Sequence, residues 1–145
     1  MQRLIQDMKT GQLNHLYLLY GEEAYLRKQY RDKLKEAIIG DDSMNYHYYE
    51  GKDVSIGEVI DQAETLPFFA ERRLIVIENS GLLKSGGEQL AEYLAAPAQT
   101  VCFLLVETEV DKRSKLYKTI AAKGCVVEFA IQDENTLKRW ILSMV

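Results

Sequence analysis

Short runs of mostly apolar residues alternate along the chain with longer stretches in which apolar positions recur every three or four residues. Such short runs, bounded by turn residues, are typical of strands that are buried on both faces of a parallel sheet. The run at residues 45–50 is rich in tyrosine but also carries polar side chains, which suits the edge of a sheet better than its centre. The predicted strands are residues 15–20, 45–50, 74–77, 101–106 and 125–129.

The stretches between these runs have the period of amphipathic helices. Between residues 22 and 39, Leu26, Tyr30 and Leu34 fall on one helical face. Further along, Ser55 is placed to cap a helix that has Glu58 at its third position, the pattern of a capping box. The other predicted helices are residues 1–9, 86–95, 112–123 and a last one that starts at 133, and the inward positions expected within 112–123 are Leu116, Tyr117, Ile120 and Ala121.

Strands that alternate with helices predict an α/β fold in which a mostly parallel sheet is covered on both faces. We therefore expect a three-layer αβα arrangement with five strands, and the unbroken apolar run at 101–106 as a central strand. A length of 145 residues is that of one ordinary domain, so residues 1–145 are expected to form a single domain. The sequence stops inside the last predicted helix without a polar tail, which leads us to expect further domains in the full protein.

Composition and charge argue against several classes of function. The chain is 47% apolar and 28% charged, the balance of a folded globular protein. Its net charge of −4 argues against autonomous binding to nucleic acid, which depends on neutralising phosphates. The longest apolar run, residues 101–106, is too short to span a membrane. Cys102 and Cys125 fall in predicted strands and are expected to be buried reduced thiols, with a disulfide between them as the alternative.

The turn between the first strand and the first long helix is where a parallel α/β sheet would hold phosphates. A phosphate-binding P-loop needs a second glycine five positions after the first, followed by Lys and then Ser or Thr. Gly21 could be the first glycine, but residues 26–28 read Leu-Arg-Lys. Glu22 and Glu23 also place two negative charges at the helix N-terminus, where they satisfy the helix dipole and oppose an anion. The sequence therefore predicts no nucleoside triphosphate at this turn, and it suggests no other cofactor.

Other candidate chemical groups are interpreted as structural. Glu22 and Glu23 would point in different directions on a helix, so they make a poor acid–base pair. Glu78, at the end of the third strand, stands where an NTPase would hold magnesium, but without a P-loop we interpret it as a polar strand end. His15 and His47 lack metal-ligand spacing. Residues 80–87, with three glycines, look like the most flexible connection. A group of basic residues is interpreted as a solvated helix face, with a phosphate contact as the alternative: Lys112, Arg113, Lys115 and Lys118.

Two adjacent phenylalanines, Phe68 and Phe69, lie between a predicted helix and a predicted strand. Such connections normally lie on the surface, and Pro67 stiffens this one by fixing its own φ and disfavouring a helical conformation in the residue before it. An exposed aromatic pair is typical of a docking point for another protein, and Arg72 and Arg73 beside it are suited to steering an acidic partner. The alternative is that the pair folds back and closes the end of the core.

Two stretches of the sequence together resemble the delta subunit of the bacterial DNA polymerase III clamp loader. Residues 16–26, which read LYLLYGEEAYL, are similar to the opening of that family. Residues 66–77, which read LPFFAERRLIVI, are similar to its sliding-clamp-binding segment and the strand that follows. The resemblance extends over essentially the whole chain.

The resemblance implies a RecA-like, AAA+-type fold, related to the P-loop NTPases, that lacks a functional nucleotide site. It implies a domain that binds the sliding clamp (the beta subunit) and holds one interface of the ring open, while other subunits hydrolyse ATP. The family's two apolar binding residues fall on Phe68 and Phe69. Leu66 and Pro67 are their supporting neighbours, and Arg72 or Arg73 is expected at the polar rim. The full set of expected clamp-binding positions is Leu66, Pro67, Phe68, Phe69, Arg72 and Arg73.

The same resemblance implies partners beyond the clamp. Other clamp-loader subunits would bind through domains that this sequence does not include, DNA would be contacted within the complex, and no membrane or cofactor would be involved. The location would be the bacterial cytoplasm, and any DNA polymerase (nucleotidyltransferase) activity would belong to the complex. The alternative class of function is a nucleotide-using α/β enzyme with an atypical phosphate loop, which saturable nucleotide binding would reveal.

Overall fold

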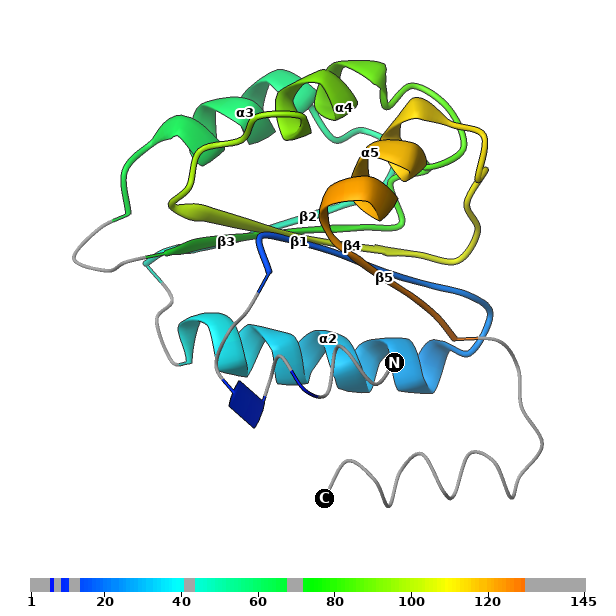
Figure 1. The fold of residues 1–145 in the computed structure, drawn as a ribbon, viewed down its shortest axis with the longest axis horizontal. Helices are drawn as coiled ribbons and strands as arrows, with labels where there is room; N and C mark the ends of the chain where they lie inside the picture. The colour runs from blue at the N-terminus through cyan, green and yellow to red at the C-terminus, as the bar shows by residue number, and fades with distance from the viewer. Residues whose placement is uncertain (1–5, 7–8, 11–13, 41–43, 68–71, 130–145) are drawn as a thin grey trace.

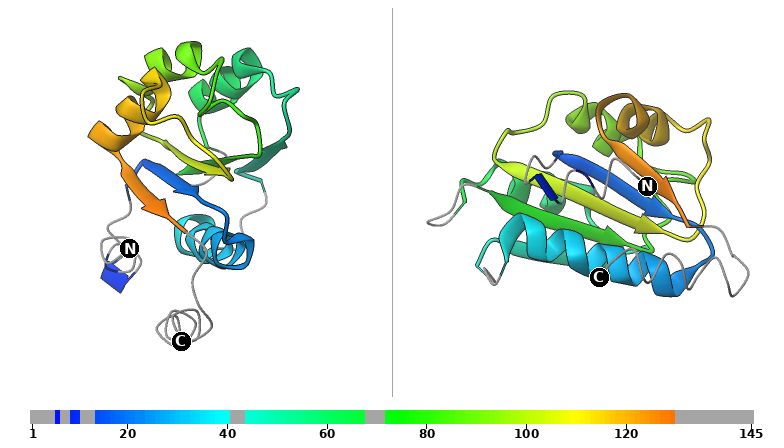
Figure 2. Two further views of the ribbon diagram at one scale, coloured as in Figure 1. Left: turned by 90° about the vertical axis from the view of Figure 1, so that its right-hand side faces the viewer. Right: turned by 60° about the horizontal axis from the view of Figure 1, so that its bottom comes forward.

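The predicted strands form one sheet in the computed structural model of the protein, which describes residues 6, 9–10, 14–40, 44–67 and 72–129. The strands lie in the order β2-β3-β4-β1-β5, and all the neighbouring strands in this sheet are parallel. As predicted, the fourth strand lies at the centre and the tyrosine-rich second strand at an edge (Figures 1 and 2). Their bounds are β1 (Leu16–Tyr20), β2 (Tyr46–Glu50), β3 (Arg73–Glu78), β4 (Val101–Glu107) and β5 (Cys125–Glu128).

Helices cover both faces of the sheet (Figure 1). Helix α2 (Ala24–Ile39) lies on one face, whereas α3 (Ile56–Glu64), α4 (Glu88–Leu94) and α5 (Lys115–Lys123) lie on the other. Alternate residues of a strand point to opposite faces. In β1, Tyr17 and Leu19 therefore belong to the core beneath α2, and Leu16 and Leu18 belong to the core on the other face. The predicted three-layer αβα arrangement is confirmed.

Three helices begin later than the sequence pattern suggested. Helix α2 starts at Ala24 instead of residue 22, with Glu23 as its cap. Helix α5 starts at Lys115 instead of residue 112, because Ser114 caps it by accepting the N–H of Tyr117 at 3.2 Å. Ala121, which was expected to point inward, is exposed. Helix α4 starts at residue 88 because Gly86 has a φ of +81°, which lies outside the helical region.

The structure also tests several local predictions. The cap of α3 is present, with the N–H of Glu58 donating to Ser55 Oγ at 3.3 Å. Cys102 and Cys125 are both buried thiols and form no disulfide, so the disulfide alternative is wrong. Among the residues described, no helix combines the length and apolar character that crossing a membrane requires. The helix predicted from residue 133 lies outside the described residues, as does most of the one predicted at 1–9.

The parallel sheet separates the two regions that the sequence singled out. Because all five strands run the same way, the chain enters every strand at one edge of the sheet and leaves it at the opposite edge. The described residues of the candidate docking segment, 65–67 and 72, lie before β3 at the entry edge. The turn after β1 and the loops after β3 and β4 lie at the exit edge, so the candidate docking segment and the candidate phosphate turn are on opposite edges.

Candidate functional site

The segment between α3 and β3 exposes an apolar side chain at its start. The chain is extended at Thr65, immediately after the last residue of α3, and Leu66 is 77% exposed. A leucine this exposed adds little to the core and is available for contact with another molecule. Phe68 and Phe69, the predicted docking pair, lie outside the described residues.

Pro67 and Arg72 are the described residues on either side of that pair. Both are half-buried, so neither is fully in the core or fully in solvent. The rim position, for which the sequence offered Arg72 or Arg73, stays a prediction for Arg72.

Arg73, the first residue of β3, points back toward the start of the same segment. It is 5% exposed, its Nε donates to the carbonyl oxygen of Thr65 at 3.2 Å, and its Nη2 donates to that of Leu66 at 2.9 Å. Its Nη1 lies 3.4 Å from Gln62 Oε1 and also contacts Nε2 of His47. Of the two arginines predicted as alternatives for the rim, Arg73 is the one whose burial does not suit that position. Arg73 binds the main chain at the base of the segment instead.

The imidazole of His47 supports Arg73 from the neighbouring strand β2. Burial, together with the positive charge of Arg73, holds the pKa of His47 below its ordinary value. The ring is therefore neutral at physiological pH, and a neutral ring with its proton on Nδ1 can accept a hydrogen bond at Nε2.

At the opposite edge of the sheet, the turn from β1 to α2 is closed by the protein itself. Gly21 has a φ of +127°, and a Cβ at this position would lie 2.3 Å from the carbonyl oxygen of Phe129. The N–H of Glu23 donates to that oxygen at 2.9 Å, and the Glu23 carboxylate caps α2 by accepting the N–H of Tyr25 at 3.2 Å. The first N–H of the helix start, which a P-loop would offer to phosphate, is thus already bonded.

A cavity of about 460 Å³ lies beside this turn, and its charge is mostly negative. Glu22, Glu109 and Glu128 line it together with Lys112. Glu109 also pairs with Lys84 at 2.8 Å. Because nucleotide phosphates are themselves negative, this lining disfavours them. The geometry supports the prediction made from the failed P-loop.

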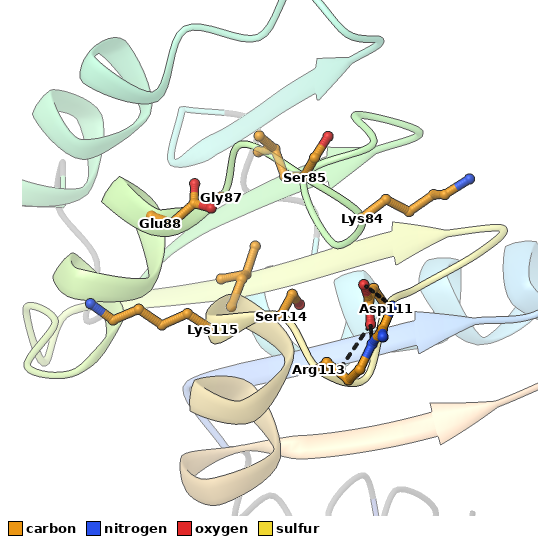
Figure 3. Close-up of a pocket in the computed structure, with 10 residues that line it drawn as sticks. Lys84, Ser85, Gly87, Glu88, Asp111, Arg113, Ser114 and Lys115 are labelled. Atoms are coloured by element: carbon orange, nitrogen blue, oxygen red, sulfur yellow. Dashed lines mark hydrogen bonds and ion pairs between the residues drawn. The ribbon is translucent and has the colours of Figure 1, made fainter.

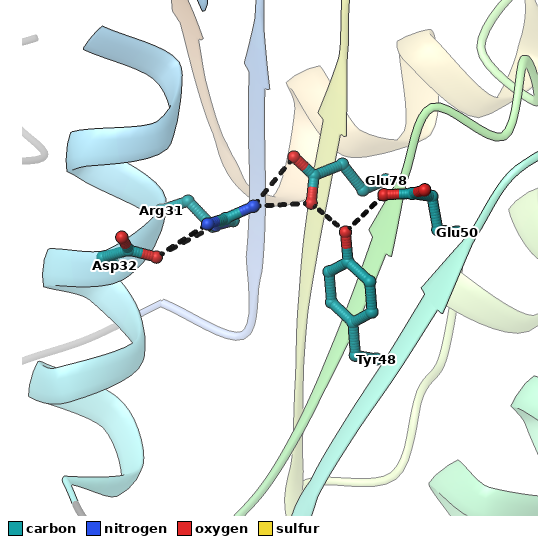
Figure 4. Close-up of polar contacts among 5 residues, drawn as sticks. All are labelled: Arg31, Asp32, Tyr48, Glu50 and Glu78. Atoms are coloured by element: carbon teal, nitrogen blue, oxygen red, sulfur yellow. Dashed lines mark hydrogen bonds and ion pairs between the residues drawn. The ribbon is translucent and has the colours of Figure 1, made fainter. Parts of the chain in front are cut away.

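Glu78, the acid at the end of β3, is bound by side chains from α2 and β2 (Figure 4). Arg31 donates to both of its carboxylate oxygens, and the Tyr48 hydroxyl lies 2.6 Å from Oε2. The same hydroxyl lies 2.7 Å from Glu50. Burial, and then its hydrogen bonds to the two carboxylates, raise the pKa of Tyr48 far above its ordinary value. Glu78 is thus an ion-pair partner in this structure, which agrees with a structural interpretation.

Glu107, the last residue of β4, is a buried acid that the sequence analysis missed. Its carboxylate is 2% exposed and accepts the N–H groups of Ser80 at 2.9 Å and Gly81 at 2.7 Å. Burial raises the pKa of Glu107, although these N–H groups oppose that shift. The loop at 80–87 is therefore fastened at its start and, with Leu83 in the core, is not the flexible connection that its glycines suggested. The signal available in the sequence was an acidic residue, Glu107, directly after the apolar run at 101–106.

A second cavity, of about 420 Å³, lies between the loops that precede α4 and α5 (Figure 3). Two of its cations have acidic neighbours: Arg113 lies 3.2 Å from Asp111, and Lys115 lies 3.5 Å from Glu92. Positive charge is therefore not concentrated here, which favours the solvated-face interpretation of these basic residues over a phosphate contact. Lys112 and Lys118 are exposed.

Most polar side chains in these clusters of the described residues form hydrogen bonds or ion pairs with neighbouring protein groups. Within the described ranges, no group of three or more His, Cys, Asp or Glu side chains is placed to hold a metal ion.

The strand order, the parallel pairing and the position of the turn after β1 define an AAA+-like, RecA-like module. Two solved structures share this fold. A DNA polymerase III gamma-subunit-related protein of Thermotoga maritima has a TM-score of 0.64 and 12% identity, covering 97% of this chain and 49% of that one. RuvB of Thermotoga maritima has a TM-score of 0.56 and 20% identity, covering 95% of this chain and 46% of that one.

Within that class, the chain belongs to the family described as DNA polymerase III, delta subunit, whose profile matches residues 17–130. The DNA polymerase III subunit delta of Bacillus subtilis is 24% identical over 136 residues, covering 85% of this chain and 39% of that protein. The structure of the Bacillus subtilis DNA clamp loader delta protein has a TM-score of 0.85 and 22% identity, covering 99% of this chain and 46% of that one. The chain thus spans less than half the length of these relatives.

Proposed function

We propose that this chain is the sliding-clamp-binding domain of a clamp-loader delta subunit and helps to open the ring for loading onto primed DNA during replication. The observation that carries the proposal is Leu66, which is 77% exposed at the start of the segment that resembles the family's clamp-binding segment. Phe68 and Phe69 enter an apolar pocket of the clamp with Leu66 and Pro67 as supporting neighbours, and Arg72 stands at its polar rim. Aromatic and aliphatic anchors of this kind supply most of the affinity of an interface.

The base of the segment supports this role. Its first residues are tied to α3 and β3 by hydrogen bonds from Arg73 to the carbonyl oxygens of Thr65 and Leu66. A docking element that is already ordered before binding loses less conformational entropy when it binds. The exposed leucine is therefore presented on a fixed base.

The domain binds without hydrolysing ATP. This part of the proposal is supported by the acidic cavity beside Gly21 and by the N–H of Glu23, which is bonded to Phe129. Other loader subunits supply ATP hydrolysis and associate through parts of the relatives that this chain does not span. DNA is contacted within the complex, in the bacterial cytoplasm.

The test is a titration of a surface-immobilised bacterial sliding clamp with the chain and with Leu66→Ala, Phe68→Ala and Phe69→Ala. Truncation of an aromatic hot spot costs at least about 2 kcal/mol, so affinity should fall roughly thirtyfold or more for each phenylalanine. Melting of the same variants should show little loss of stability, whereas a phenylalanine that closes the core would cost about 3–5 kcal/mol on truncation.

Tyr25→Ala is the matched control. Tyr25 is 53% exposed but lies at the start of α2, on the opposite edge of the sheet, so its truncation should leave clamp affinity unchanged. Unaltered clamp affinity in Phe68→Ala and Phe69→Ala, with intact folding, would contradict the proposal. Collapsed stability in those variants would instead favour the core-closing role.

A further inference from the structure

Arg73 is buried, yet among the described residues the partners of its guanidinium are dipoles and not an acid. Among the described residues, the ion pairs within 4.0 Å involve other cations, and the partners of Arg73 are two main-chain carbonyls, an amide and an imidazole. A buried charge is costly unless its hydrogen bonds are satisfied. Each of these partners is therefore needed, which makes Arg73 sensitive to their positions.

The geometry uses the planar fork of arginine. Nε and Nη2 lie on the same side of the guanidinium and donate to the carbonyl oxygens of consecutive residues, Thr65 and Leu66. Two neighbouring carbonyls that converge on one rigid donor restrict the backbone between them. The remaining nitrogen, Nη1, reaches Gln62 on α3 and His47 on β2. The main-chain N–H of Arg73 donates to Thr100 at 2.8 Å, which fixes the arginine itself to the sheet.

We propose that Arg73 is a positioning residue for partner docking: by chelating the carbonyls of Thr65 and Leu66, it sets the direction in which the exposed Leu66 and the segment after it leave the domain. The inference rests on the proposed function, and it gives Arg73 a different role from the rim residue Arg72. His47 and Gln62 contact Nη1, on the other side of the guanidinium. Loss of the fork leaves the fold in place but makes the partner order the segment during binding, which weakens affinity.

Three variants separate this role from its alternatives. Arg73→Met removes every donor of the fork but keeps an apolar stem, and clamp affinity should fall roughly tenfold. Arg73→Lys keeps the charge but cannot chelate two carbonyls, so it should not restore the affinity. Arg31→Met removes the arginine that binds the other end of β3, at Glu78, and should leave clamp affinity unchanged.

Two measurements distinguish a positioning role of Arg73 from a general loss of stability. Amide hydrogen exchange should accelerate at Thr65, whose N–H donates to the carbonyl oxygen of Gln62 at 3.2 Å, in Arg73→Met while the amides of β4 stay protected, and this measurement needs no clamp. In a double-mutant cycle, Arg73→Met and Leu66→Ala should be less than additive in clamp affinity, because both act through Leu66.

Several outcomes would overturn the inference. Full clamp affinity in Arg73→Lys would mean that the positive charge is sufficient and the fork is not needed. Additive losses of affinity in the double-mutant cycle would mean that Arg73 acts independently of Leu66. Unchanged exchange at Thr65 would also overturn it. If Arg73→Met does not fold, Arg73→Lys carries the test by exchange and affinity. Failure of the unaltered chain to bind the clamp counts against the proposed function, whereas the exchange result still decides whether Arg73 orders the segment.

Discussion

Arg31 and Glu78 join helix α2 to the end of strand β3 through a single nitrogen. Arg31 Nη1 lies 2.9 Å from Oε1 and 2.7 Å from Oε2 of the Glu78 carboxylate. The side chains are 19% and 11% exposed, so the pair is largely shielded from water. In nucleotide-hydrolysing proteins an acid near this place holds magnesium. In this chain the same carboxylate is engaged by the protein.

Arg31→Met should destabilise the fold by about 1.5–3 kcal/mol, because the partly buried Glu78 carboxylate loses its charged hydrogen-bond partner. Urea denaturation measures the change. The double variant with Glu78→Gln should recover part of the loss, since it removes the uncompensated charge. A single variant as stable as the unaltered chain would show that the pair contributes nothing measurable.

The turn after β1 should bind neither ATP nor ADP, with or without magnesium. Glu22 and the other carboxylates of the adjacent cavity oppose phosphate, and the N–H of Glu23 is already bonded. Calorimetric titration should therefore give no heat beyond dilution. Saturable, magnesium-dependent binding that disappears in Lys112→Ala, the variant that removes a cation from the cavity, would establish the nucleotide-using enzyme as the better interpretation.

Cys102 should react slowly with thiol reagents in the native state. It is 1% exposed, and burial raises the pKa of its thiol to about 11. At pH 8 roughly one thiol in a thousand would be ionised even if the reagent could reach it. A Cys125→Ala background assigns the signal to Cys102, and urea should restore fast labelling. Rapid labelling without denaturant would show that β4 is not buried at this residue.

The stability of the fold should fall as the pH is lowered past the ordinary pKa of histidine. Burial and Arg73 hold the pKa of His47 below that value, so the unfolded chain takes up a proton at about pH 6.5 before the folded chain does. The unfolded state then binds more protons, and stability decreases with falling pH. His47→Gln should flatten this dependence between about pH 7.5 and 5.5, because glutamine can accept from Arg73 without titrating. If the urea denaturation midpoint changed with pH to the same extent in both proteins, this role of His47 would be contradicted.

Local patterns were enough for most of the fold. The unbroken apolar run at 101–106 predicted the central strand because a strand covered on both faces has no polar alternation. The polar residues among the tyrosines of β2 predicted an edge. The failed phosphate turn could also be read directly, since a P-loop is defined by residues at fixed spacing around Gly21.

The sequence by itself thus determined which segments are strands and helices and that their sheet is parallel. The exposed aromatic pair and the family resemblance together predicted that Leu66 begins a docking segment. The tertiary structure decided what Arg73 and Glu107 do. The phenylalanines beside it in the sequence suggested that Arg73 was one of two candidates for a rim position. The glycines of residues 80–87 suggested a flexible loop, which Glu107 in fact binds. Their hydrogen-bond partners, His47 for one and Ser80 with Gly81 for the other, lie on elements far away along the chain. A buried charge takes its position from whatever donors and acceptors the fold brings to it, and that is not encoded in local periodicity.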